Sequence, residues 1–107
     1  MGRSGVPNLA GVRGRIDRLD LRLLRLLNQR ATLALAIGRI KRRRKWPTFD
    51  AQREAFVLRR VSRANRGPLS ARAVQRIFQA VLRECRRRQR LADRTSDTDV
   101  DHSLLGA

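Results

Sequence analysis

Residues 9–45 of the chain read LAGVRGRIDRLDLRLLRLLNQRATLALAIGRIKRRRK, and this stretch decides the fold. Its apolar residues recur in steps of three and four, a spacing that keeps one face of a helix directed at a core. The stripe consists of Ile16, Leu19, Leu23, Leu26, Leu27, Leu33, Ala34 and Ile37. We therefore predict one long helix that starts between residues 9 and 15 and ends near Lys45, because Pro47 disfavours helix in the residue before it.

Two shorter helices are predicted after it. Asp50 is suited to cap the first of them, which runs to about Asn65 and is followed by Gly67 as a stop signal. Ser70 can cap the second, which we expect to end near Ala92. The apolar spacing is helical throughout, so the predicted fold class is an all-α, three-helix chain with a long first helix.

The length of the first helix predicts a second copy of the chain. A helix of about 33 residues measures roughly 50 Å, which is too long for the two shorter helices to cover. We therefore expect a homodimer. Within each chain, we divide the sequence into a flexible lead at residues 1–8, a helical domain at 9–92, and a polar, acidic tail at 93–107 that is predicted to be disordered.

Composition limits the possible classes of protein. The sequence has no apolar run long enough to span a membrane and no apolar segment at its start, so a cytoplasmic location is expected. Cys85 is the only cysteine, and the only histidine, His102, lies in the polar tail. We therefore expect no internal disulfide, no metal site and no histidine-based catalysis.

The charge of the chain attracts anions. It carries 26 basic and 9 acidic residues, a formal net charge of +17, and such a field draws in nucleic acids and small anions alike. The run KRRRK at residues 41–45 keeps open a basic helical nucleic-acid-binding protein. However, only 4% of the residues are aromatic, which offers little surface for base stacking. We expect at most non-specific binding to nucleic acids.

Polar and charged residues lie on the apolar face of each predicted helix. Because buried charge costs free energy unless it is paired, these positions indicate an enclosed pocket for a charged ligand. The residues are Arg30, Lys41, Asp50, Glu54, Cys85 and Gln89. Arg53 lies between the two acids and can pair with either of them or with a carboxylate of the ligand.

Several of these residues also have a purely structural interpretation. Lys41 could extend to solvent, Asp50 could only cap its helix, and Cys85 could pack as a small apolar side chain. Arg13 lies about 25 Å from Arg30 along the same helix, so it could reach this pocket only from an antiparallel partner chain. Its alternative is a solvated surface arginine.

Five short motifs follow one another in order over residues 9–92. They are R-x-x-I-D-x-L-D from Arg13, L-L-x-L-L-N-x-R ending at Arg30, G-x-x-K ending at Lys41, D-x-x-R-E from Asp50, and I-F-x-x-V from Ile77, followed by Gln89. Each motif is weak alone, but their order and spacing resemble the small, all-helical class of chorismate mutases.

This resemblance implies an intertwined homodimer with two equivalent pockets. The implied activity is that of an isomerase, which rearranges chorismate to prephenate in the shikimate pathway, for aromatic amino acid or related specialised biosynthesis. The implied reaction needs no cofactor. Carried over by position, Arg30 and the partner subunit's Arg13 would clamp the two carboxylates of the substrate, and Lys41 and Gln89 would donate to its ether oxygen.

The remaining roles concern the ring of the substrate. The resemblance implies that Asp50 and Glu54 hold the ring-hydroxyl end, Asp50 through its main chain, and that Arg53 supports the carboxylate region. Cys85 departs from the family pattern, because a small hydroxyl residue usually occupies its position and a thiol is a weaker donor. Cys85 therefore leaves an enzyme acting on 4-amino-4-deoxychorismate as an alternative, and one acting on isochorismate is a further alternative. The glycines beside Arg13 keep open a mutase that needs an activating partner enzyme.

Overall fold

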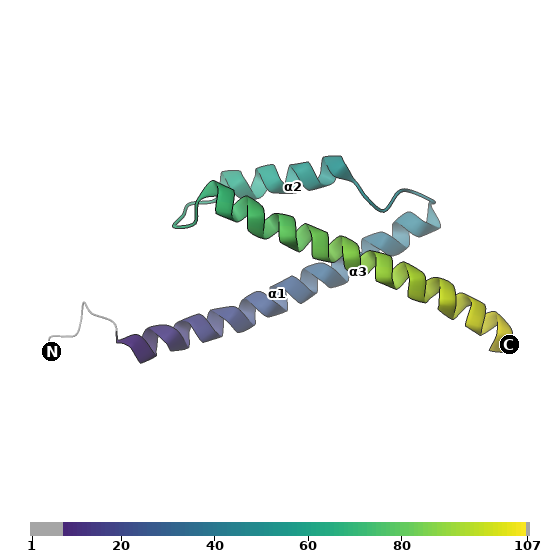
Figure 1. Cartoon of the computed structure of the whole chain (residues 1–107), viewed down its shortest axis with the longest axis horizontal. Helices are drawn as coiled ribbons and strands as arrows, with labels where there is room; N and C mark the ends of the chain where they lie inside the picture. Colours follow the sequence, from purple (N-terminus) through teal and green to yellow (C-terminus); the bar gives the residue numbers. More distant parts are fainter. Residues whose placement is uncertain (1–7, 107) are drawn as a thin grey trace. The chain divides into compact units, whose positions relative to one another are not determined.

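The computed structural model describes the backbone of residues 8–106 and the side chains of residues 8–94. It contains three helices, α1 (Leu9–Arg43), α2 (Ala51–Ala64) and α3 (Ala71–Gly106), and no strand occurs within residues 8–106 (Figure 1). The predicted all-α fold with a long first helix is confirmed. The chain divides into two compact units, Met1–Arg30 and Ala31–Ala107. The predicted flexible lead lies outside the described residues, apart from Asn8.

The described part of the first unit is the N-terminal portion of α1. Asn8 begins the helix by accepting a hydrogen bond from the main-chain N–H of Gly11 at 2.5 Å. The apolar stripe of this portion is exposed, and Leu26 for example is 60% accessible. Leu19 and Leu23 are also more than half exposed. This portion of α1 therefore carries an exposed apolar face.

In the second unit, α1 ends in a left-handed turn. Lys45 has a φ of 57°, and the N–H groups of Lys45 and Trp46 donate to the carbonyls of Arg42 and Lys41 at 3.1 and 2.8 Å. This pair of bonds is the Schellman arrangement, which satisfies the last carbonyl groups of a helix. The helix thus stops at Arg43, slightly before the predicted end, because this turn and not the later proline terminates it.

Local hydrogen bonds set the bounds of α2. The side chain of Asp50 accepts from the N–H of Arg53 at 3.0 Å, so the predicted cap is confirmed. At its other end α2 stops at Ala64, and the side chain of Asn65 accepts from the N–H of Gly67 at 3.1 Å. Gly67 has a φ of 77°, a value that glycine adopts without steric cost.

The third helix begins as predicted and ends much later. Ser70 accepts from the N–H of Ala73 at 3.0 Å, which confirms the cap. The predicted end near Ala92 is wrong, because α3 continues to Gly106. Residues 71–105 contain neither glycine nor proline, so nothing in the covalent structure interrupts the helix, and polarity alone does not end one. The division into a domain and a tail stays a prediction.

The small core of the second unit lies on α3. Val74, Leu82 and Cys85 are buried, and α2 packs along the first part of this helix (Figure 1). These residues recur at spacings of eight and three, so they share one face of α3. The same face continues to Gln89, and this places a polar residue at the edge of the core. None of the described helices is both long enough and apolar enough to cross a membrane.

Candidate functional site

Six of the eight predicted site residues lie in the second unit. Lys41 is near the end of α1, three lie at the start of α2, and two lie on α3. The six are Lys41, Asp50, Arg53, Glu54, Cys85 and Gln89. The other two, Arg13 and Arg30, belong to the first unit. Their predicted contacts with a common ligand stay predictions.

Lys41 reaches the linker between α1 and α2 instead of extending into bulk water. Its Nζ donates to the main-chain oxygen of Thr48 at 3.0 Å, and the side chain is partly buried. An ammonium group has three N–H donors, so two remain for a ligand. This bond fixes both the direction of the ammonium and the path of the linker that leads into α2.

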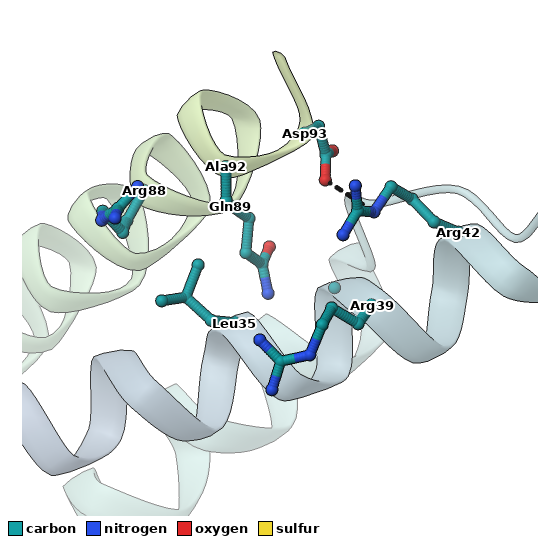
Figure 2. A pocket seen from close by; sticks show the side chains of 8 residues that line it. Leu35, Arg39, Arg42, Arg88, Gln89, Ala92 and Asp93 are labelled. Atoms are coloured by element: carbon teal, nitrogen blue, oxygen red, sulfur yellow. Dashed lines mark ion pairs between the residues drawn. The ribbon is translucent and has the colours of Figure 1, made fainter. Parts of the chain in front are cut away.

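Gln89 is the most enclosed polar residue of the site. It is only 7% exposed, and its Nε2 donates to the main-chain oxygen of Ala34 at 2.6 Å. Figure 2 shows the amide extending from α3 towards α1. Gly38 lies opposite this side chain: a Cβ built there would lie 3.4 Å from Cγ of Gln89, in ordinary contact, so a residue larger than alanine would meet the glutamine. The second N–H of the amide remains as a donor.

The start of α2 shows which of its polar groups are already engaged. One side-chain oxygen of Asp50 is occupied by the cap, so the structural interpretation of this residue holds. The side chain of Arg53 pairs with neither of the two neighbouring acids among the described residues, and its contact with a carboxylate of the ligand stays a prediction. Its guanidinium lies over the ring of Phe56, at 5.1 Å from the centroid, and the residue is exposed.

Glu54 is paired with a residue that the sequence reading missed. Its Oε2 lies 2.8 Å from Nε of Arg86 on α3, and the two side chains are 20% and 30% exposed. The same guanidinium lies over the ring of Phe49, at 4.8 Å from the centroid. Arg86 therefore joins α3 to the start of α2 and to the linker before it. Its spacing of three residues from Gln89 was the available signal.

Cys85 lies among the apolar residues of the core. It is 8% exposed and shares its face of α3 with Val74 and Leu82. This placement supports its interpretation as a small apolar side chain. Whether its thiol also contacts a ligand stays a prediction.

A pocket of about 220 Å³ lies beside Gln89, between α3 and the end of α1 (Figure 2). Its lining is strongly basic and carries an ion pair at 3.1 Å between Nε of Arg42 and Oδ1 of Asp93. The lining residues are Leu35, Gly38, Arg39, Arg42, Arg88, Gln89, Ala92 and Asp93. Gln89 is the one predicted site residue in this lining. Asp93 also lines this pocket.

Comparison with known proteins agrees with this fold. The family model for chorismate mutase type II matches residues 12–90. The bifunctional chorismate mutase/prephenate dehydratase of Neisseria gonorrhoeae is 44% identical over 73 residues, covering 68% of this chain and 20% of that protein. The protein of the same name from Pseudomonas aeruginosa is 37% identical over 82 residues, covering 72% of this chain and 22% of that one.

A solved structure shows the same architecture. The chorismate mutase (form II) of Thermus thermophilus matches with a TM-score of 0.71 and 27% identity, over 72% of this chain and 88% of that one. The chain spans about a fifth of the length of the curated relatives it matches. Its three helices define an all-α domain. The chain belongs to the chorismate mutase type II family.

Proposed function

We propose that this chain is a chorismate mutase, an isomerase that converts chorismate to prephenate. The observation that carries the proposal is the match of residues 12–90 to the family. Lys41, Glu54 and Gln89 lie within this range, in the motifs described from the sequence. In the second unit these side chains are held by specific contacts with Thr48, Arg86 and Ala34 respectively.

The reaction needs orientation and charge stabilisation. The ether bond between carbon and oxygen breaks while a bond between two carbons forms within the same molecule, so no nucleophile or proton transfer is required. Negative charge grows on the ether oxygen as the bond breaks. The remaining N–H groups of Lys41 and Gln89 stabilise this charge more in the transition state than in the ground state. Because both side chains are already anchored, little reorganisation is needed.

The substrate carries two carboxylates, and we infer that two arginines bind them. Arg30 supplies one, and the partner subunit's Arg13 supplies the other, since bidentate arginine contacts select and orient carboxylates. The exposed apolar face of the first unit supports an intertwined homodimer, because a second copy would cover it. Within such a dimer each pocket contains residues of both chains.

The ring end of the substrate is assigned to the start of α2. Glu54 accepts from the ring hydroxyl through Oε1, the carboxylate oxygen other than the one paired with Arg86. Asp50 contributes through its main chain, because its side chain accepts the cap bond. The exposed guanidinium of Arg53 adds positive charge near the carboxylates. We place the product in aromatic amino acid biosynthesis. The cytoplasmic location and an activating partner enzyme stay predictions.

The direct test follows chorismate consumption by the purified protein and identifies the product. Wild-type protein is expected to form prephenate, and Lys41→Ala is expected to lower kcat by a factor of about 100–1,000, the usual cost of removing a preorganised donor. Arg43→Ala is the matched control, because it removes one charge from the same basic run at an exposed position. Failure of the wild-type protein to consume chorismate overturns the proposal.

A further inference from the structure

The contact between Glu54 and Arg86 balances charge at one end of the site. The pair spans 2.8 Å between Oε2 and Nε, and both side chains are partly buried. Bulk water therefore screens the pair less than it screens the exposed arginines that follow on α3. The carboxylate and the guanidinium together carry no net charge.

Arg86 is held in this position from two sides. Glu54 forms an ion pair with its Nε, and the ring of Phe49 lies under its guanidinium at 4.8 Å from the centroid. Phe49 belongs to the linker that Lys41 holds through the oxygen of Thr48. The charge of Arg86 is thus a fixed feature of the space beside Glu54, and a bound ligand must accommodate it.

The fixed charge of Arg86 interacts differently with two related substrates, one with a hydroxyl and one with an ammonium group on the ring. A ring hydroxyl is neutral and needs only an acceptor, which the free oxygen of Glu54 supplies. An ammonium group at the same ring position gains from the carboxylate but is repelled by the guanidinium behind it. A carboxylate without such a partner would favour the ammonium.

We propose that Arg86 sets the selectivity of this subsite for a ring hydroxyl over a ring ammonium group. The inference rests on the proposed function, and it answers the question that Cys85 leaves open, whether the substrate is chorismate or 4-amino-4-deoxychorismate. Arg86 acts through Glu54 and through its own field, so it is a positioning and selectivity residue and not a catalytic one.

The test compares kcat/KM for chorismate and for 4-amino-4-deoxychorismate in matched variants. Arg86→Gln removes the charge and keeps a polar side chain, so the ratio in favour of chorismate is expected to fall about tenfold. Arg86→Lys keeps the charge and is expected to hold the ratio within about twofold of wild type. The control is Arg87→Gln, which removes an equal charge from the adjacent exposed position and is expected to leave the ratio unchanged.

A second variant removes the acidic member of the pair, so this test does not depend on the folding of Arg86→Gln. Glu54→Gln leaves the charge of Arg86 uncompensated, so activity on the amino analogue is expected to fall about tenfold further than activity on chorismate. Equal losses on both substrates in Glu54→Gln, or an unchanged ratio in folded Arg86→Gln, overturn the selectivity role while leaving the mutase activity standing. If the wild-type protein does not rearrange chorismate, both proposals fail.

Discussion

The amide of Gln89 crosses from α3 to α1 and donates to the carbonyl of Ala34 at 2.6 Å. In a regular helix this carbonyl also accepts from the N–H four residues later, which here belongs to Gly38. The glutamine is therefore attached at a point on α1 where the helix has no side chain. Its direction depends on that absence, because a larger residue at Gly38 would occupy the space of its Cγ.

Substitutions at Gly38 should separate helix stability from the direction of Gln89. In Gly38→Ala the new methyl group meets Cγ of Gln89 at 3.4 Å, an ordinary contact, and the helix gains up to about 1 kcal/mol in free energy of unfolding. Gly38→Leu cannot be accommodated without moving Gln89, so kcat should fall at least about tenfold. Circular dichroism and chorismate turnover measure the two effects. A fully active Gly38→Leu protein would show that Gln89 does not need this position.

Gln89→Glu should convert the activity into one that is lost as pH rises. A carboxylate beside the carbonyl of Ala34 and the ether oxygen faces two acceptors, and it can donate only when it is protonated. Its charged form is also costly to bury at a position that is 7% exposed. The pH profile of kcat/KM should therefore shift towards acid relative to wild type. An unshifted profile would contradict the role of Gln89 as a donor.

The elements that the sequence predicted well are those set by local chemistry. Asp50 and Ser70 both cap their helices through a bond to the N–H three residues on, so a single residue in the right context was enough. Helix ends were less predictable. The left-handed turn that ends α1 is formed by Lys45 and not by a glycine, so the usual residue that marks such a turn is missing from the sequence. The third helix continues through a polar segment that contains no helix breaker.

The site was predictable in its residue types but not in its pairings. The spacing of polar residues on apolar faces selected Glu54 and Gln89, which the structure places in specific contacts. It did not select Arg86 or Arg42 as the partners of Glu54 and Asp93. With so many arginines on every helix, the sequence does not indicate which of them meets an acid on another element.

Lys45→Gly should stabilise the protein. Lys45 has a φ of 57°, a conformation that costs a residue with a Cβ about 1 kcal/mol and costs glycine almost nothing. The side chain is exposed, so its removal sacrifices little packing. Urea denaturation is expected to show a gain in the free energy of unfolding of about 1 kcal/mol, whereas Lys45→Ala, which keeps the Cβ, should show little gain. Equal effects of the two substitutions would count against strain at this turn.

Mixing two inactive variants should reveal whether Arg13 acts across the dimer. Arg13→Ala and Lys41→Ala each disable both pockets of their own homodimer. If a pocket takes Arg13 from one chain and Lys41 from the other, one pocket of a mixed dimer receives both substitutions and the other receives neither, so one of the two sites is restored.

Random exchange of equal amounts makes about half of all dimers mixed, and the expected activity is about a quarter of wild type per chain. An arrangement in which Arg13 serves the pocket of its own chain predicts the opposite result. Each pocket of the mixed dimer would then lack one of the two groups, and activity would not recover. Native mass spectrometry confirms that mixed dimers form, and the rate of chorismate loss measures the recovery. Confirmed mixed dimers without recovered activity would exclude the trans contact, whereas recovery requires it, because no other combination of these two chains assembles an intact pocket.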